Sequence, residues 1–357
     1  MTDRQTLFSG TEAPSAHLAI DAQSLGRYLN RHLEGMSGPL EVVKFKGGQS
    51  NPTYKISGRD KSYVLRRRPP GQLLESAHAI DREYRVLSAL SKGQFPVPHP
   101  HLYCADESVI GSAFYVVDYQ EGRIFWNAEM PGMDPGQRAA IYDRTNALLA
   151  RLHDLDVDAL GLGDFGKPSN YIARNLARWS KQYVQSQLVE VPDMDWLMKT
   201  LPERLPRSES TALIHGDFGL YNIIVHPTNA DVVAVLDWEL ATLGDPLTDL
   251  AHHLMPWWNP PDRVGGSATS LIGFDLGELG IPSMEDYIAL YCQRRGLSAI
   301  PDLTFHLSYA AFRYAAIVQG ILKRAKDGAN SSRKVLHTQD RVFQIAATAR
   351  RTLSQAL

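Results

Sequence analysis

Alternating apolar and polar positions predict three short strands near the start of the chain. They cover Leu40–Phe45, Thr53–Ser57 and Ser62–Arg67, and a glycine-containing turn joins the first two. Apolar residues recur at helical spacing on either side of these strands, over Asp21–Glu34 and Ser76–Ser91. The pattern therefore predicts a small N-terminal unit built from a sheet and two helices.

Helical periodicity dominates the chain beyond a buried strand expected at Ala113–Tyr119. Long amphipathic helices are predicted over Asp134–Leu155 and Tyr171–Gln187, the first with an Asp-Pro start that suits a cap and first turn. Further helices that close the chain are expected near Met284–Arg295, Leu303–Lys326 and Lys334–Leu353.

These patterns divide the chain into three parts. Residues 1–20 contain Ser, Thr, Pro and Gly without periodicity, and we expect them to be a flexible arm. Residues 21–121 are expected to form the first lobe and residues 122–357 the second. The sequence therefore predicts an α+β protein of two lobes.

Composition and charge exclude several classes of protein. A formal net charge of -2 gives no overall attraction to nucleic acid or to acidic membranes. Cys104 and Cys292 are too few and too far apart for a disulfide framework or a zinc site. The N-terminus lacks an apolar signal core, and no apolar run approaches membrane-spanning length. We therefore expect a cytoplasmic protein with no nucleic-acid or membrane partner, whose oligomeric state the sequence does not indicate.

A polar loop, His215–Asn222, lies between two apolar runs. Asp217 and Asn222 stand five residues apart in it, and Asp237 ends a third apolar run. Phosphoryl transfer to a hydroxyl needs such a set, because one Asp accepts the hydroxyl proton while an Asn and a second Asp hold Mg²⁺ against the nucleotide phosphates. The alternative is that His215, Asp217 and Asn222 form only a hydrogen-bonded turn.

The spacing H-x-D-x-x-x-x-N is that of the protein-kinase catalytic loop. Here Gly216 follows the histidine, and Asp237 is followed by Trp238-Glu239. This H-G-D form with a later D-W-E resembles the aminoglycoside phosphotransferase and choline kinase branch of the kinase-like fold. Within that branch, the chain most resembles the phosphotransferase domain of some acyl-CoA dehydrogenase fusion proteins and its stand-alone bacterial relatives.

This resemblance implies a protein-kinase-like two-lobe fold, with a small antiparallel-sheet N-lobe and a mainly helical C-lobe. It also implies an ATP- and Mg²⁺-dependent phosphotransferase that moves the γ-phosphate to a hydroxyl of a small molecule. Asp217 is then the catalytic base, Asn222 and Asp237 hold the metal, and His215 fixes the shape of the loop.

Nucleotide contacts are expected from a strand, a helix, a turn and a hinge. Arg66 stands in place of the kinase phosphate-binding lysine, and Glu83 offers it a carboxylate. The alternative for Arg66 is a solvated basic run, and the alternative for Glu83 is a surface position on an amphipathic helix. Alternation along the strand places the Arg66 side chain on the same face as Val64. For the turn, a plain hairpin is the alternative. The remaining expected contacts are Gly47, Gly48, Ser50 and Asn51 in the turn and Asp118, Tyr119 and Gln120 in the hinge.

Three other features have competing interpretations. Gly161–Pro168 nearly matches a phosphate-binding P-loop, but Pro168 replaces the magnesium-binding hydroxyl and a helix precedes it, so we reject that reading. Asp249 resembles the carboxylate that braces the kinase catalytic loop, with helix capping as the alternative. His99 and His101 are expected to be ordinary loop histidines.

The acceptor is indicated by the resemblance alone, which implies a hydroxy acid or a hydroxyacyl-CoA thioester. The alternatives are a choline- or aminoglycoside-type small-molecule kinase and a non-catalytic nucleotide-binding pseudokinase. The sequence does not separate ATP from GTP. It also leaves open whether the acceptor pocket is lined by Trp179, Trp257, Trp258, Arg313 and Arg324.

Overall fold

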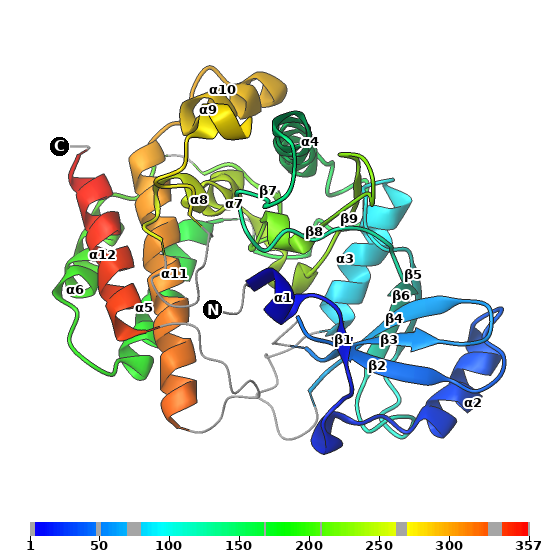
Figure 1. The fold of residues 1–357 in the computed structure, drawn as a ribbon. Helices are drawn as coiled ribbons and strands as arrows, with labels where there is room; N and C mark the ends of the chain where they lie inside the picture. The colour runs from blue at the N-terminus through cyan, green and yellow to red at the C-terminus, as the bar shows by residue number, and fades with distance from the viewer. Residues whose placement is uncertain are drawn as a thin grey trace.

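The computed structural model describes residues 4–47, 51–69, 80–167, 169–207, 209–261, 270–327 and 338–355. A sheet with two flanking helices forms the N-terminal part, and helices form most of the rest (Figure 1). The predicted α+β class is therefore confirmed.

The N-terminal sheet is antiparallel throughout, with strand order β1-β2-β3-β4-β6-β5. Two of the predicted strands, β3 and β4, have the predicted bounds. The sequence analysis predicted no strand at β5. The strands are β1 (Thr11–Glu12), β2 (Glu41–Phe45), β3 (Thr53–Ser57), β4 (Ser62–Arg67), β5 (Pro100–Cys104) and β6 (Phe114–Asp118).

Each face of this sheet is covered by a different helix. Helix α2 (Ala22–His32), which begins at the Asp21 cap, packs Leu25 and Leu29 into a cluster that includes Leu65 of β4. Helix α3 (Ile80–Lys92) contacts β5 and β6 and belongs to the core shared with the C-terminal part. The predicted start of α3 at Ser76 lies outside the described residues. Alternation along β4 thus sends Leu65 toward α2 and the neighbouring residues toward the inside of the molecule.

The described part of the N-terminal segment corrects one prediction. Instead of a flexible arm, residues 4–18 contain α1 (Arg4–Phe8), β1 and the 3-10 helix η1 (Ala16–Leu18). The backbone of β1 pairs with β2, and Lys46 N donates to Gly10 O at 3.1 Å. The side chain of Gln5 donates to Ile124 O at 2.8 Å. Local composition did not reveal this order because the partners lie far away in the sequence.

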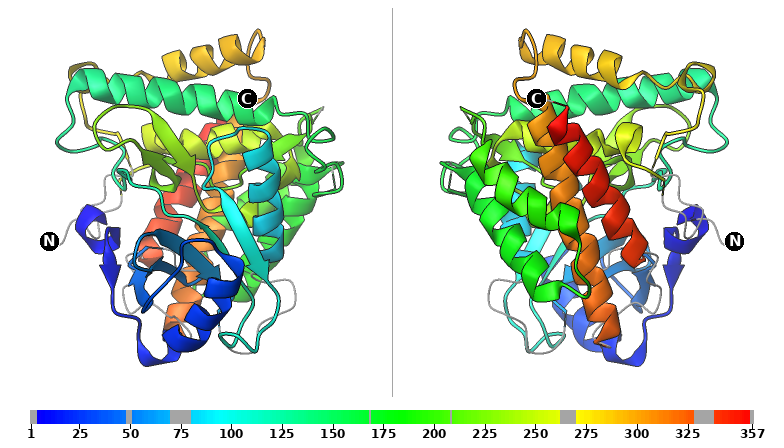
Figure 2. Two further views of the ribbon diagram at one scale, coloured as in Figure 1. Left: turned by 90° about the vertical axis from the view of Figure 1, so that its right-hand side faces the viewer. Right: turned by 90° about the vertical axis from the view of Figure 1, so that its left-hand side faces the viewer.

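The C-terminal part is mainly helical, and Figure 2 shows α4 and α10 side by side on one flank. Helices α5, α6, α11 and α12 pack together around their own apolar core. Predicted residues 334–337 of the last helix lie outside the described residues. The helices are α4 (Pro135–His153), α5 (Tyr171–Ser186), α6 (Pro192–Glu203), α7 (Pro246–His253), α8 (Met255–Trp258), α9 (Leu276–Leu279), α10 (Met284–Arg295), α11 (Leu303–Lys326) and α12 (Gln339–Ser354).

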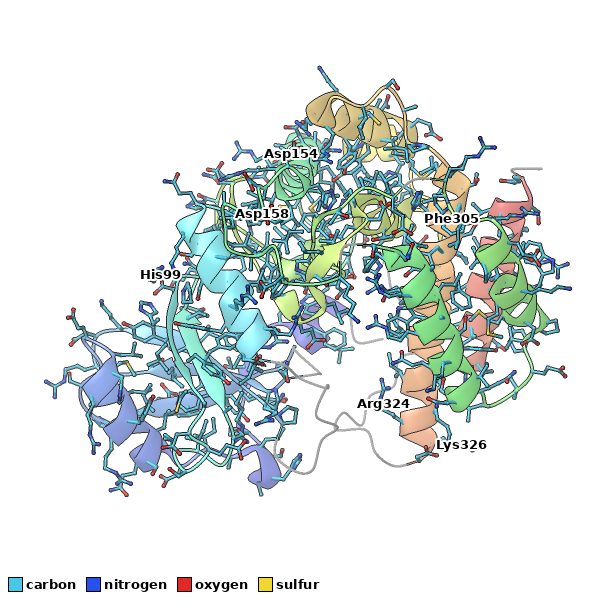
Figure 3. The ribbon with its side chains drawn as sticks, turned by 180° about the vertical axis from the view of Figure 1, so that it is seen from behind. His99, Asp154, Asp158, Phe305, Arg324 and Lys326 are labelled. Carbon is cyan, nitrogen blue, oxygen red and sulfur yellow. The ribbon has the colours of Figure 1, made fainter. Side chains whose placement is uncertain are left out.

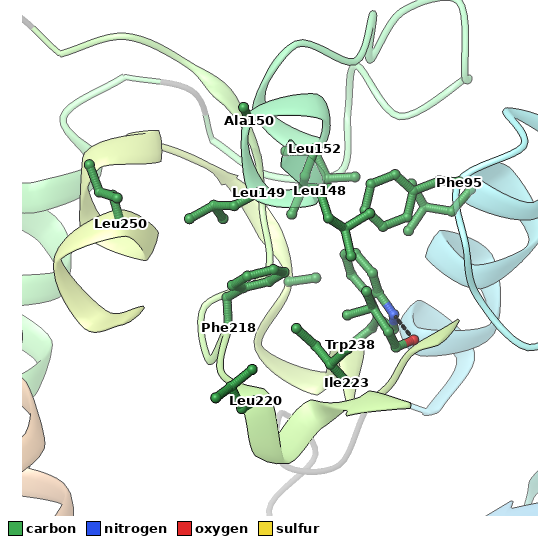
Figure 4. Packing of buried hydrophobic residues seen from close by; sticks show 14 of the residues in the cluster. Phe95, Leu148, Leu149, Ala150, Leu152, Phe218, Leu220, Ile223, Trp238 and Leu250 are labelled. Atoms are coloured by element: carbon green, nitrogen blue, oxygen red, sulfur yellow. Dashed lines mark hydrogen bonds between the residues drawn. The ribbon is translucent and has the colours of Figure 1, made fainter. Parts of the chain in front are cut away.

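Two small antiparallel sheets position the loop His215–Asn222. One pairs β7 (Ala212–Ile214) with β10 (Thr242–Gly244), and the other pairs β8 (Ile223–Val225) with β9 (Val232–Val235). The loop connects β7 to β8, so both of its ends are fixed. Figure 4 shows how apolar residues of the loop and its surroundings pack against α4. They are Phe218, Leu220, Ile223 and Trp238, which share a hydrophobic cluster with Leu148, Leu149 and Leu152 of α4.

Within the described ranges, no helix combines the length and the apolar character that a membrane crossing requires.

Candidate active site

The shape of the loop His215–Asn222 is fixed by a glycine and a buried carboxylate. Gly216 has φ +82°, and a Cβ there would come within 2.7 Å of Leu240 O. The carboxylate of Asp249 accepts from His215 N at 2.6 Å and from Gly216 N at 2.8 Å. Asp249 therefore supports the loop backbone, while the cap of α7 is Asp245, which accepts from Leu247 N.

His215 is fully buried, and backbone groups occupy both ring nitrogens. Its Nε2 contacts Leu236 O at 2.8 Å, so Nε2 carries the hydrogen, and its Nδ1 accepts from Asp217 N at 3.2 Å. These contacts tie the loop to the segment before Asp237, and they leave no ring nitrogen for proton transfer to a substrate.

Asp217 presents a carboxylate that is about one-third exposed, with a relative side-chain exposure of 34%. Its Oδ1 lies 2.9 Å from Tyr221 Oη and 3.0 Å from His252 Nε2. Asn222 Nδ2 donates to Asp217 O at 2.9 Å and contacts Oδ2 at 3.2 Å. Burial alone would raise the pKa of Asp217, but hydrogen bonding and attraction to His252 outweigh it and lower the pKa.

A buried arginine gathers three acids on the other side of the site. Arg66 Nε lies 3.1 Å from Glu83 Oε2, and Arg66 Nη2 lies 2.7 Å from Asp237 Oδ1 and 3.1 Å from Glu239 Oε2. Carboxylate oxygens of these three acids all lie within 4.8 Å of one another. Sequence reasoning noted Glu239 only as part of the D-W-E pattern and assigned it no role. Its side chain enters the site because Trp238–Leu240 turn as a 3-10 helix, η3.

Burial raises the pKa of Glu83 to about 8 despite the attraction of Arg66, and the charges of Asp237 and Glu239 act in the same direction as burial. Tyr115 Oη also donates to Glu83 Oε2, at 3.2 Å. For Arg66, burial favours the neutral form, but Asp237 and Glu83 dominate and raise the pKa further above its ordinary range. The cluster therefore holds more negative than positive charge.

Asp237 has an unusual backbone conformation, with φ 64° and ψ 61°. A non-glycine residue in this left-handed region costs about 1–3 kcal/mol, and such residues cluster at functional sites. Here the conformation directs the carboxylate toward Arg66.

A cavity of about 450 Å³ joins these groups to the N-terminal sheet. Of the expected nucleotide contacts, Arg66, Gly47, Asp118, Tyr119 and Gln120 line it, together with Asn222 and Asp237. Gly48 and Ser50 lie outside the described residues. Asn51 is buried beside the cluster, where its Nδ2 donates to Glu239 Oε2 at 3.3 Å. Val64 also lines the cavity, so the expected face of β4 is correct.

Several cavity residues were missed from sequence. Phe8, Gly10 and Thr11 of the N-terminal segment line one wall, and Trp126 lines the same cavity. Lys55 of β3 places its Nζ 4.1 Å from the centre of the Tyr119 ring. His101 lies on β5, and its Nε2 contacts Asp118 Oδ1 at 2.6 Å, which corrects its prediction as an ordinary loop histidine.

The segment Gly161–Lys167, which resembles a P-loop in sequence, instead accepts hydrogen bonds from arginines of α3. Arg82 donates to Phe165 O at 2.7 Å, and Arg85 donates to Gly161 O at 2.9 Å and pairs with Asp164. Since Arg82 and Arg85 flank Glu83 on α3, these contacts fix the helix that delivers Glu83 to Arg66.

The acceptor-side candidates occupy different environments. Arg313 is buried and donates to Gly216 O, with Trp179 packed 5.7 Å from its guanidinium, whereas Arg324 is exposed at the far end of α11 (Figure 3). Trp257 packs into the main core against Tyr287, with its Nε1 bonded to Pro282 O at 2.9 Å. Trp258 packs against both cores. Arg313 and Arg324 thus lie in different surroundings, and Met255–Trp258 forms the short helix α8.

These residues fit a nucleotide with Mg²⁺. Mg²⁺ prefers oxygen ligands, which are offered by Asp237 and the Oδ1 atom of Asn222, both of which line the cavity, and by Glu239, which lies beside Asp237. Buried oxygens without a hydrogen-bond partner among the described residues also point to absent ligands: Asn51 Oδ1 and Glu83 Oε1.

Comparison with known proteins identifies a family and relatives that this chain resembles in sequence. The model of the phosphotransferase enzyme family matches residues 41–280. Acyl-CoA dehydrogenase family member 11 of Rattus norvegicus is 42% identical over 348 residues, which are 94% of this chain and 44% of that protein. Family member 10 of Mus musculus is 43% identical over 319 residues, 88% of this chain and 29% of that protein. The chain thus spans less than half the length of these curated relatives.

Solved structures agree with the sequence matches. A structure from Ralstonia eutropha, described as a candidate aminoglycoside phosphotransferase, has a TM-score of 0.83 at 41% identity and covers 94% of this chain and 99% of its own. A choline kinase from Cryptosporidium parvum has a TM-score of 0.64 at 11% identity, covering 94% and 97%, and so shares the fold. The predicted protein-kinase-like fold and the predicted resemblance are confirmed. Because the family match runs through the sheet, the hinge and the loop His215–Asn222, this chain belongs to the phosphotransferase enzyme family and is a small-molecule phosphotransferase.

Proposed function

We propose that the enzyme uses ATP and Mg²⁺ to phosphorylate a hydroxyl group of a small molecule. The observation that carries the proposal is that Arg66, Asn222 and Asp237 line one cavity although they come from separate segments, while Glu83 pairs with Arg66 and Asp217 accepts a hydrogen bond from Asn222. When bound, Mg²⁺ neutralises phosphate charge and ATP supplies the phosphoryl group.

Each side chain has a role that its contacts support. Asp217 accepts the proton of the hydroxyl that attacks. Asn222 is anchored through Nδ2 on Asp217, which leaves its Oδ1 for the metal, and Asp237 supplies a carboxylate oxygen. Arg66 contacts phosphate oxygens and Glu83 orients its guanidinium. The backbone of Asp118, Tyr119 and Gln120 contacts the base of the nucleotide.

For the acceptor we propose a hydroxy acid or a hydroxyacyl-CoA thioester. The support is the 41–43% identity to proteins named acyl-CoA dehydrogenases, which this chain matches over part of their length. A choline-type cage is less well supported, since Trp257 is committed to the core and to Pro282 O. A non-catalytic role is disfavoured because every carboxylate and amide of the proposed set is in place.

The first experiment is a melting-temperature series with ATP, with and without Mg²⁺. Ligand at about a hundredfold over its Kd adds roughly 2.7 kcal/mol to the free energy of unfolding. We expect a rise in Tm that needs both Mg²⁺ and Asp237, so that Asp237→Ala loses it. The matched control is Asp60→Ala, which alters an exposed acid in the turn between β3 and β4. No rise in Tm with ATP or GTP would refute the proposed function.

The second experiment identifies the acceptor through ADP release. Hydroxyacyl-CoA thioesters, the free hydroxy acids, choline and an aminoglycoside are compared at equal concentration. We expect the first two classes to accelerate ADP release above the rate with water. Acceleration by choline or the aminoglycoside alone would contradict the proposed acceptor but keep the kinase.

A further inference from the structure

Tyr221 and His252 converge on one oxygen of Asp217. Tyr221 Oη lies 2.9 Å from Asp217 Oδ1, and His252 Nε2 lies 3.0 Å from the same oxygen. Tyr221 Oη and His252 Nε2 are also 3.0 Å apart. The three groups thus form a closed triangle, although His252 belongs to α7 and the other two belong to the loop His215–Asn222.

Proton assignment in this triangle makes Oδ1 a double acceptor. An ionised carboxylate only accepts hydrogen bonds, so the Tyr221 hydroxyl and the His252 Nε2–H both donate toward Oδ1. His252 is 7% exposed, and the Tyr221 hydroxyl is occupied by this triangle, so water has little access to Oδ1. Oδ2 is contacted by Asn222 Nδ2 at the longer distance of 3.2 Å.

The ring of Tyr221 is held on both sides. It stacks on Trp126 at a centroid separation of 6.3 Å and an interplanar angle of 17°, and Trp126 contacts Phe8 at 4.8 Å. A Cβ at position 219 would lie 2.6 Å from the Tyr221 ring, so the glycine at this position leaves room for the ring on its other side. The hydroxyl is therefore delivered to Asp217 by a packed ring rather than by a freely rotating one.

His252 is delivered by the helix that also supports the loop backbone. Asp249 and His252 are three residues apart on α7 and so face the same side. Asp249 holds His215 N and Gly216 N, while His252 reaches the carboxylate of Asp217. One helix thus fixes both the backbone and the side chain of the proposed base.

We propose that Tyr221 and His252 are positioning residues that occupy Oδ1 of Asp217, so that Oδ2 is the atom that takes the proton from the acceptor hydroxyl. This inference rests on the proposed function, in which Asp217 is the base. In the step, the hydroxyl O–H bond breaks and its proton passes to Oδ2. The hydroxyl oxygen bonds to the γ-phosphorus, and the bond from phosphorus to the bridging oxygen breaks with its electron pair leaving on ADP.

The test uses the full chain with ATP and Mg²⁺ and with water as the acceptor, measured as release of radiolabelled phosphate. Tyr221→Phe removes the hydroxyl but keeps the stacked ring, and His252→Phe removes the donor but keeps a ring of similar size. His252→Gln restores an N–H donor. Tyr183→Phe is the matched control, since Tyr183 is buried in α5 and its hydroxyl has no partner among the described residues.

We expect Tyr221→Phe and His252→Phe each to lower the rate of phosphate release about 10- to 100-fold, because misplacing a catalytic group by about 1 Å costs on the order of 10²-fold. His252→Gln should recover most of the loss and Tyr183→Phe should show none. The ATP- and Mg²⁺-dependent rise in Tm should be unchanged in all four variants, because the nucleotide site is intact.

Two results would overturn the inference while leaving the proposed function standing. One is a rate within twofold of wild type in Tyr221→Phe and His252→Phe while Asp217→Asn is inactive. The other is a loss in His252→Phe that His252→Gln does not restore. If wild type and Asp217→Asn released phosphate at the same rate, Asp217 would not be the base, and both the proposed function and this inference would fall.

Discussion

Two aspartate–histidine pairs occur at the loop His215–Asn222, Asp249 with His153 and Asp217 with His252, and their carboxylates differ in what they can still bind. Asp249 is fully buried, its two oxygens accept from His215 N and Gly216 N, and His153 Nε2 lies 3.5 Å from Oδ2. Asp217 is about one-third exposed, and only its Oδ1 is occupied by two side-chain donors. In both, burial would raise the pKa of the carboxyl, but contacts with the histidine and other groups lower it.

The comparison shows how one pair of residue types supports two roles. Backbone N–H groups saturate Asp249, so it can only stabilise the fold of the loop. Asp217 is partly exposed and its Oδ2 is contacted by Asn222 Nδ2 at the longer distance of 3.2 Å, so it can still bind another group. The two aspartates differ in the hydrogen-bond partners of each carboxylate oxygen, since both have a histidine nearby.

The largest effect is expected for Asp217→Asn, since an amide cannot accept the hydroxyl proton. Turnover should fall by roughly 10²–10⁴, the usual contribution of a general base. The ATP- and Mg²⁺-dependent rise in Tm should remain, because the substituted group lies beside the nucleotide rather than in its binding set. ADP release and the Tm series measure both. A turnover within tenfold of wild type would contradict the role given to Asp217.

Asp249→Asn should act mainly on stability. The amide can accept from only one of the two backbone N–H groups, and it presents its own hydrogens to the other. An unsatisfied buried donor and a lost charged acceptor cost about 3 kcal/mol of unfolding free energy, measured by urea denaturation.

The matched control for that variant is Asp245→Asn on the same helix. Asp245 is also buried, but it caps α7 by accepting from Leu247 N, and Asn caps helices as well as Asp does. Equal losses in the two variants would show that Asp249 has no special part in holding the loop.

Gly216→Ala should distort the loop between the two carboxylates. Its φ of +82° disfavours a side chain, and the new Cβ would lie 2.7 Å from Leu240 O, so we expect a loss of about 1–3 kcal/mol. Turnover should fall as well, because Asp217 follows directly. Gly296→Ala is the control: φ is +64° but no atom lies within 4 Å of its Cβ, so the strain arises without the collision. A larger loss at Gly296 would contradict the explanation.

The smallest effect concerns His306, a buried histidine whose side chain has no hydrogen bond to a carboxylate among the residues that the structure describes. Burial lowers its pKa from 6.5 to about 4. The unfolded chain then binds the proton more tightly than the folded one, so stability falls as the pH falls from 6.5 toward 4. Between pH 7 and 5.5 this single group should cost about 1 kcal/mol. Denaturation of wild type and His306→Phe over this range should show a steeper loss in wild type; parallel curves would refute the assignment.

Sequence patterns correctly predicted the elements whose structure depends on residues close by in the sequence. The bounds of β3 and β4 follow from strict alternation, and the cap of α2 follows from Asp21 before an apolar stripe. The motif spacing also selected Asp217, Asn222 and Asp237. Asn222 and Asp237 line the cavity with Arg66, Asp217 accepts from Asn222, and Glu83 pairs with Arg66. Their roles stay predictions until the variants are measured.

Other features depend on distant partners and could not be read from local patterns. The ordered N-terminal segment needs β2 and Ile124, and Glu239 needs the turn of η3 to reach Arg66. His252 is an ordinary helical residue in sequence, and only the crossing of α7 beneath the loop gives it Asp217 as a partner. The sequence left open whether Trp257 lines the acceptor pocket, because its packing against Tyr287 in the main core depends on a residue distant in sequence.

The aromatic wall of the cavity also has an optical consequence. Two of the six tryptophans, Trp126 and Trp238, line the cavity, and Trp126 stacks against Tyr221. The indole of Trp126 is partly exposed and that of Trp238 is buried, so an adenine ring or a phosphate that enters will change their polarity and quenching unequally. Under the proposed function, these two tryptophans should report nucleotide occupancy through their fluorescence, and Trp126→Phe would separate the two signals.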